Sequence, residues 1–186
     1  GSDKPDLRFD MKINDLNEIF KNIEFAPFEN KEAINCIVIR GKASKYSRKD
    51  LEKLTDFVKQ YKAGSLFYLK YNEKDFTGSI AKVLTDDLKK ELIKKLSLEE
   101  DDLILIVADT YKAVKQSLGA LRCKIAKDQE IINKDDYKFV WITDFPSFEY
   151  SEEEKRYLAL HHPFTAPKDE DIEKLLTDKG NCYSKA

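Results

Sequence analysis

The sequence has few cysteines and no long apolar run, and both shortages exclude classes of protein. Cys36, Cys123 and Cys182 are an odd number without zinc-ligand spacing, so neither a disulfide framework nor a zinc motif is predicted. The longest apolar run, LILIVA at 103–108, is far shorter than the roughly 18 residues of a transmembrane helix. Residues 1–15 are polar and do not resemble a signal peptide. We therefore expect a cytoplasmic protein without a membrane partner, in which Cys36 and Cys123 are buried.

Glycine is also scarce, and the glycine-containing motifs of common enzymes are missing. The six glycines form neither G-x-x-x-x-G-K nor G-x-G-x-x-G, and the sequence has no nucleophile elbow. P-loop, Rossmann and serine-hydrolase functions therefore lack the residues that their chemistry requires.

Charge is balanced over the whole chain but is uneven along it. The formal net charge is −2, which does not support a general attraction to nucleic acid or anionic lipid. Residues 40–62 contain eight basic and three acidic side chains, whereas residues 144–154 contain five acidic and no basic ones. We interpret both runs as solvated faces. The alternative, for the part of the basic run at 48–62, is a basic helix that contacts the phosphates of RNA.

Periodic apolar patterns predict alternating strands and helices in the first two thirds of the chain. Buried strands are expected at 33–40, 66–71 and 103–108, with a weaker one at 76–84. Amphipathic helices are expected at 48–62 and 85–96, where Ser47 and Thr85 are the N-caps, and another begins at Tyr111. Further along, strands at 138–144 and 155–162 are expected to pair, and a short acidic helix covers 169–176.

The only histidines, His161 and His162, are adjacent and precede Pro163. Metal-binding histidines on a helix are normally three or four residues apart, so this pair is a weak metal motif. Strand alternation would place His162 with Leu158 and Leu160, and His161 on the other face, while the proline favours an extended chain at His162. Two interpretations stay open: a structural pair, or a site in which His161 hydrogen-bonds an anionic ligand.

Asp144, at the end of the strand expected at 138–144, is a second candidate. Its carboxylate could bind a ligand, but we favour hydrogen bonds to the amides of the following turn.

Four stretches, in the same order as in the family, resemble bacterial-type aspartyl-tRNA synthetase. They are GSDKPDLRF at 1–9, LGALRCKIAKD at 118–128, FVWITDFPSFEY at 139–150 and LALHHPFTAPKDED at 158–171. The resemblance implies a catalytic-domain lead-in at 1–22, an inserted GAD domain at 23–110 and a partial class II catalytic segment at 111–186. The implied fold is α+β: a two-layer GAD-type domain, with helices 48–62 and 85–96 on one face of a mainly antiparallel sheet, and part of a class II antiparallel sheet.

The resemblance also implies a function. Such a homodimeric ligase activates L-aspartate with ATP and Mg²⁺ to aspartyl-adenylate and transfers it to tRNA(Asp). The first histidine of HHPFT, here His161, would contact aspartate, and His162 is a weaker candidate. No catalytic residue or metal ligand is assigned in this chain. The family's ATP-binding arginine of motif 2 and its motif 3 have no counterpart, so the chain alone is expected to bind no cofactor and to be inactive. The alternative is a stand-alone GAD-type module that binds tRNA or protein.

Overall fold

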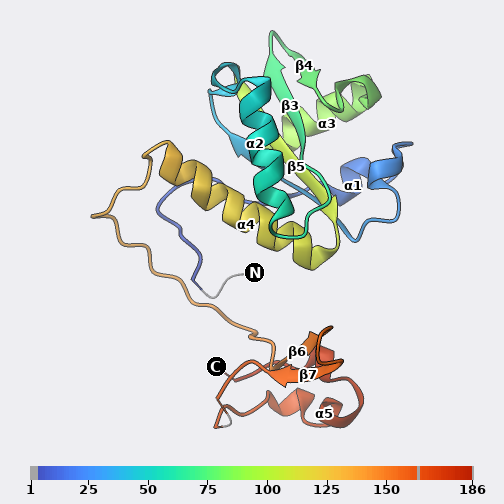
Figure 1. Ribbon diagram of the computed structural model, residues 1–186, viewed down its shortest axis with the longest axis vertical. Coiled ribbons are helices and arrows are strands. Elements are labelled where there is room, and N and C mark those ends of the chain that lie inside the picture. Colours follow the sequence, from blue (N-terminus) through green and yellow to red (C-terminus); the bar gives the residue numbers. More distant parts are fainter. Residues whose placement is uncertain (1–3, 163, 186) are drawn as a thin grey trace. The chain divides into compact units, whose positions relative to one another are not determined.

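The computed structural model describes residues 4–162 and 164–185 and divides into two compact units, one ending at Lys138 and one beginning at Phe139 (Figure 1). The first unit contains β1 (Asn14–Asp15), α1 (Asn17–Phe20), β2 (Ala33–Ile39), α2 (Arg48–Lys59), β3 (Phe67–Asn72), β4 (Asp75–Gly78), α3 (Asp86–Leu96), β5 (Asp102–Asp109) and α4 (Tyr111–Asp128). The second contains β6 (Phe148–Ser151), β7 (Arg156–Ala159) and α5 (Lys174–Thr177). Short 3-10 turns η1 to η5 occur at Ala26–Phe28, Ala43–Lys45, Ala81–Val83, Asp169–Asp171 and Lys179–Asn181.

The first unit is built on a five-stranded sheet in the order β1-β2-β5-β3-β4. All four strand pairs are antiparallel, and β5 lies at the centre, where Leu105 pairs with Ile37 and Ile104 pairs with Leu69. The predicted α+β class and the mainly antiparallel sheet are therefore confirmed.

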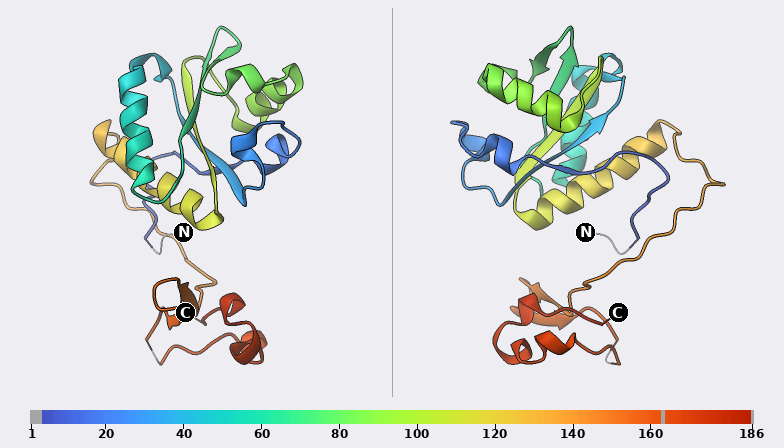
Figure 2. Two further views of the ribbon diagram at one scale, coloured as in Figure 1. Left: turned by 45° about the vertical axis from the view of Figure 1, so that its right-hand side comes forward. Right: turned by 180° about the vertical axis from the view of Figure 1, so that it is seen from behind.

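Helices cover both faces of this sheet (Figure 2). On one face, Ile37 and Leu105 belong to a core shared with α2 and α4. On the other, Val38 and Ile104 belong to a core shared with α1 and α3. The expectation that helices 48–62 and 85–96 share one face of a two-layer unit was wrong. Successive side chains of a strand point to opposite faces, so two adjacent strands buried along their whole length need a cover on each side.

The start of each main helix follows the sequence closely. Ser47 forms a capping box with Asp50 at the start of α2, and Thr85 accepts a hydrogen bond from the backbone N–H of Leu88 at the start of α3. The weaker strand expected at 76–84 ends at Gly78, whose φ is +138°. A Cβ there would lie 2.3 Å from the carbonyl oxygen of Tyr68, so only glycine fits this close approach.

An ion pair links β2, β5 and the end of α3. The buried carboxylate of Asp102 accepts a 2.6 Å hydrogen bond from Arg40 and 2.9 Å bonds from the backbone N–H groups of Gly41 and Glu99. Arg40 also donates to the carbonyl oxygen of Leu96 at 2.8 Å. The buried carboxylate thus has several hydrogen-bond partners, and these offset the free-energy cost of removing its charge from water.

Helix α4 holds the N-terminal segment through one arginine. Arg122 Nε donates to the carbonyl oxygen of Met11 at 2.8 Å, and Nη1 donates to that of Asp6 at 2.9 Å. Its guanidinium also lies 4.3 Å from the ring centre of Phe9. Because α4 packs on α2, β2 and β5, it lies in the first unit, beyond the residue-110 boundary expected for the GAD domain.

The second unit contains a two-stranded hairpin that is displaced from the predicted one. Its strands are β6 and β7, with Glu149 opposite Leu158, whereas the strand expected at 138–144 is irregular. Phe139 and Trp141 in that segment are both 94% exposed. An apolar pattern forms a strand only when another strand pairs with it, and none of the described residues pairs with 138–144 in a strand.

Two smaller expectations also needed correction. The acidic helix expected at 169–176 is instead the turn η4 followed by α5. Cys36 is buried as expected and Cys182 is also buried, but Cys123 is exposed because it lies on the outer side of α4.

We predict that Arg122→Met lowers the free energy of unfolding by about 2 kcal/mol, because two backbone carbonyls lose a charged donor and the contact with Phe9 is lost. Urea unfolding followed by far-UV circular dichroism measures this change. Lys127→Met removes an exposed cation from the same helix and is the control, with an expected change within about 0.5 kcal/mol. Equal stability of the two variants would contradict the role of Arg122.

Candidate functional site

His161 and His162 lie just after β7, and they differ in exposure. His161 is half-buried and His162 is exposed. Both histidines line one hollow, and the strand alternation that we expected to separate their side chains does not reach them. Strand β7 ends at Ala159, and Leu160 is 46% exposed, so no inward leucine face continues to the histidines. Pro163, expected to keep His162 extended, lies outside the described residues.

A pocket of 180 Å³ surrounds His161 and brings together residues that are distant in sequence. Three hydroxyl side chains line it: Ser147, Thr165 and Ser184. The hydroxyl oxygens of Ser147 and Ser184 are 3.0 Å apart, and the backbone N–H of Ser147 donates to the carbonyl oxygen of Cys182 at 2.8 Å. We call this hollow the histidine pocket.

The His161 ring has one fixed contact and one unused nitrogen. It packs edge-on against Phe145, with ring centres 5.2 Å apart at 88°. Its Nε2 is buried and has no hydrogen-bond partner among the described residues. An unpaired buried polar atom costs about 1–3 kcal/mol, so this nitrogen is suited to a ligand that supplies a partner. With a proton on Nε2, it would donate a hydrogen bond to a carboxylate.

His162 is held by the following turn. Its Nδ1 accepts a hydrogen bond from the backbone N–H of Phe164 at 3.3 Å, and the two rings are 4.6 Å apart. The bond leaves the proton of a neutral His162 on Nε2. His162 Nδ1 is thus already hydrogen-bonded within the turn, and only Nε2 is available to a ligand.

Asp144 and Lys168 form an ion pair, and each is adjacent in sequence to a residue that lines the histidine pocket or contacts His161. Lys168 Nζ donates to the Asp144 carboxylate, which also accepts a 3.2 Å hydrogen bond from Thr143 Oγ1. Lys168 follows Pro167, which lines the pocket, and Asp144 precedes Phe145, which contacts His161. The Lys168 hydrogen bond is the main cause of a lowered Asp144 pKa, and that bond in turn raises the pKa of Lys168. Asp144 therefore pairs with a lysine rather than with the turn amides that we favoured.

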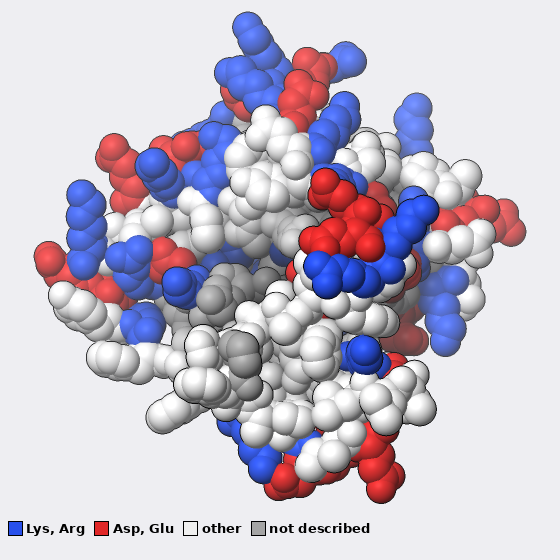
Figure 3. All heavy atoms as spheres, turned by 60° about the horizontal axis from the view of Figure 1, so that its bottom comes forward, with Lys and Arg blue, Asp and Glu red and all other residues white. Residues whose placement is uncertain are grey.

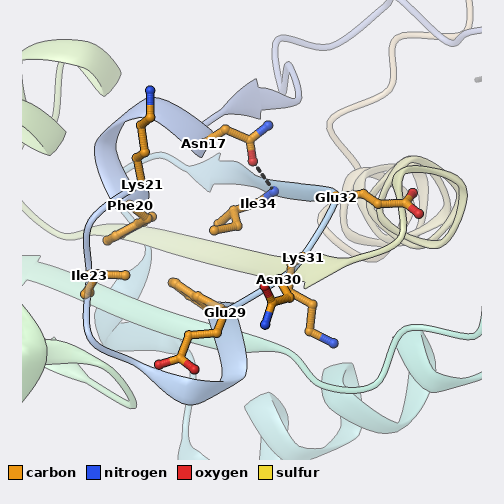
Figure 4. Close-up of a pocket in the computed structure, with 10 residues that line it drawn as sticks. Asn17, Phe20, Lys21, Ile23, Glu29, Asn30, Lys31, Glu32 and Ile34 are labelled. Carbon is orange, nitrogen blue, oxygen red and sulfur yellow. Dashed lines mark hydrogen bonds between the residues drawn. The ribbon is translucent and has the colours of Figure 1, made fainter.

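Besides a hollow of 540 Å³ beside the N-terminal segment and α4, two larger hollows lie in the first unit. One of 590 Å³ lies between α1 and the start of β2, where Asn17 Oδ1 accepts a 2.7 Å hydrogen bond from the backbone N–H of Ile34 (Figure 4). It is lined by both lysines and glutamates, so its charge does not favour either an anionic or a cationic ligand. The other, of 580 Å³, lies between the start of α2 and the end of α4.

Residues 4–162 and 164–185 contain neither a candidate metal cluster nor a helix that could cross a membrane. Within these ranges, no three histidine, cysteine, aspartate or glutamate side chains gather as a metal site would require. No helix in them has both the length and the apolar character needed to cross a bilayer.

Comparison with known proteins shows one family match inside the first unit and a similarity over the whole chain. The GAD domain model matches residues 25–118, which is half of the sequence. The chain belongs to the GAD-domain family. This match ends at residue 118, within α4.

The whole chain is also similar to part of longer bacterial enzymes, as the four quoted stretches predict. It is 51% identical to an aspartate--tRNA ligase of Clostridium botulinum (strain Loch Maree / Type A3) over 189 aligned residues, which cover 100% of this chain and 32% of that protein. It is 47% identical to an aspartate--tRNA ligase of Streptococcus equi subsp. zooepidemicus, covering 96% of this chain and 30% of that protein. The chain thus spans about a third of the length of these relatives.

Sequence reasoning named the two histidines and Asp144 but missed the three hydroxyls of the histidine pocket. Ser147, Thr165 and Ser184 come from three separate segments, and no local spacing marks them. The only sequence signal is that two of them, Ser147 and Thr165, lie inside stretches that resemble the synthetase family.

We predict that Lys168→Met raises the pKa of Asp144 towards the ordinary carboxyl value, because the donor that stabilises the carboxylate is removed. Since folding lowers this pKa, the ion pair favours the folded state above the ordinary carboxyl pKa and is lost as pH falls through the lowered value. NMR titration of the Asp144 carboxyl carbon measures the shift. Lys179→Met, an exposed site in the same unit, is the control. An unchanged titration in Lys168→Met would show that the pair does not form in solution.

Proposed function

We propose that this chain is part of an aspartate–tRNA ligase, which activates L-aspartate with ATP to aspartyl-adenylate and esterifies the 3′ end of tRNA(Asp). The similarity to such ligases extends beyond the GAD domain and covers the second unit, where the histidine pocket lies. The observation that carries the proposal is the buried, unpartnered Nε2 of His161 in that pocket. In this assignment, residues 1–22 lead into the catalytic domain and residues 111–186 belong to it.

In the proposed reaction, His161 binds and orients the substrate. Its Nε2–H donates a hydrogen bond to a carboxylate of aspartate, which fills the empty hydrogen-bonding position. The edge-on contact with Phe145 restricts rotation of the imidazole, so little entropy is lost when the bond forms. Holding the carboxylate in line with the α-phosphorus of ATP promotes adenylate formation. His162 is the weaker candidate, because its Nδ1 already accepts the Phe164 N–H.

The remaining substrates and partners belong to the whole enzyme. The described residues contain no cluster that fits Mg²⁺, so we assign the binding of ATP and Mg²⁺ to other parts of the ligase. We propose that the enzyme is a cytoplasmic homodimer. We also propose that the 186 residues alone do not activate aspartate, because the sequence contains nothing like the family's ATP-binding motifs 2 and 3.

A second candidate function is a GAD-type module that binds tRNA or protein without catalysis. The lysine-lined hollow between α2 and α4 favours the tRNA form of this candidate. The two functions are compatible, because a synthetase must also hold its tRNA.

We predict that, in the full-length ligase, changing the residue equivalent to His161 to alanine lowers kcat/KM for aspartate by about 10- to 150-fold. This factor corresponds to about 1.5–3 kcal/mol for a hydrogen bond to a charged group. Aspartate-dependent ATP–pyrophosphate exchange measures it.

The same substitution at His162 is the matched comparison and should have a smaller effect. Kinetics unaltered by the His161 change would contradict its role in binding aspartate. Exchange activity in the isolated 186-residue chain would contradict the proposal that this chain is inactive alone.

A further inference from the structure

The hollow between α2 and α4 is lined by more cations than anions. Four lysines and two aspartates border its 580 Å³: Lys42, Lys45, Lys53, Lys124, Asp50 and Asp128. We call it the lysine groove. On the face drawn in Figure 3, acidic and basic side chains are interspersed. The groove therefore differs from the balanced charge of the whole chain.

The local ion pairs leave two of these lysines uncompensated. Lys53 lies 3.6 Å from Asp50, and Lys124 lies 2.8 Å from Asp128. Lys42 Nζ instead donates to the neutral Gln129 Oε1 at 2.6 Å. The side chain of Lys45 is exposed and makes no hydrogen bond or ion pair with any described residue. The groove thus has a local charge of +2, supplied by Lys42 and Lys45.

The segment that carries these lysines is fixed to the fold. The turn Ala43–Lys45 is anchored by the 2.7 Å bond from the Ala43 N–H to the Asp101 carbonyl, and the Asp101 carboxylate accepts both the N–H and the hydroxyl of Ser44. Lys42 is held by Gln129, whose Nε2 donates to the Tyr46 hydroxyl at 2.8 Å. The Lys42 ammonium and the backbone that carries Lys45 are therefore already held in place, so less entropy is lost when an anion binds.

We infer that the lysine groove binds the phosphodiester backbone of tRNA, with Lys42 and Lys45 contacting phosphates. The inference rests on the proposed function, which supplies tRNA as the polyanion that this protein meets. Lysine ammonium groups bind phosphate oxygens as point charges, without selecting a base sequence. The groove therefore adds affinity and positions the tRNA, whereas aspartate is bound in the second unit.

Fluorescence anisotropy of labelled tRNA with the 186-residue chain tests the inference. In 50 mM salt, Lys42→Gln/Lys45→Gln should weaken binding by about three- to tenfold, because two phosphate contacts are lost. The slope of log affinity against log salt should fall by about 1.5. Lys94→Gln/Lys95→Gln removes the same charge from α3, on the other face of the sheet, and should change neither quantity.

A single charge reversal separates a loss of tRNA binding from a loss of folding. Because the Lys45 side chain has no partner among the described residues, Lys45→Glu should weaken binding while the melting temperature stays unchanged, with Lys94→Glu as its control. Equal weakening by groove and control variants, or no tRNA binding by the unaltered chain in 50 mM salt, would overturn the inference. Displacement of tRNA by polyglutamate at equal charge concentration would also overturn it, since the groove would then prefer acidic peptide.

The outcome can be separated from that of the proposed function. Normal tRNA binding by the groove variants, together with loss of pyrophosphate exchange in the His161 variant, would reject the groove and retain the ligase. Loss of tRNA binding by the groove variants, together with an unaffected His161 variant, would retain the groove and reject the aspartate contact.

Discussion

The first unit depends on the burial of β5 on both faces and along both edges. Residues 102–108 are all buried, and β2 and β3 pair with the two sides of this strand. Each fully buried leucine or isoleucine contributes about 1.5–3 kcal/mol, but only if a helix covers the face on which it lies. Helix α4 provides part of one cover, and Arg122 of that helix then holds residues 6–11. The position of the N-terminal segment thus follows from the burial of the central strand.

Local rules predicted the elements of this unit because the relevant interactions are local. The Ser47 capping box spans three residues, and the apolar run of β5 is continuous in sequence. The face that each helix covers was not predictable in this way. A strand buried on both sides has no polar face to assign, so the sequences of α2 and α3 fit either side equally well. The exposure of Cys123 was unpredictable for a similar reason, because it depends on which side of α4 faces the sheet.

In the second unit, contacts between residues distant in sequence determine more of the structure, and fewer of the expected elements were confirmed. The segment 138–144 has a strand-like pattern, yet the hairpin forms at β6 and β7, which pair with each other across a short turn. The histidine pocket depends on isolated bridges, such as Pro146 with Tyr183 and Pro167 with Ser184, that bring three segments together. Spacing alone therefore identified His161 as unusual but could not place the hydroxyls around it. The proposed role of His161 came from the family resemblance, which rests on several of these segments taken together.

Both candidate sites are defined by what the fold leaves unpaired rather than by residue type. His161 Nε2 is the buried side-chain atom without a partner among the described residues, although histidine itself is common in protein cores. Likewise, the net charge of −2 conceals the lysine groove, where only two of the four lysines have carboxylate partners. A sequence counts charges and polar groups, whereas binding depends on those that remain after internal pairing. Only the three-dimensional contacts reveal that remainder, which in the two candidate sites is one imidazole nitrogen and two ammonium groups that have no carboxylate partner among the described residues.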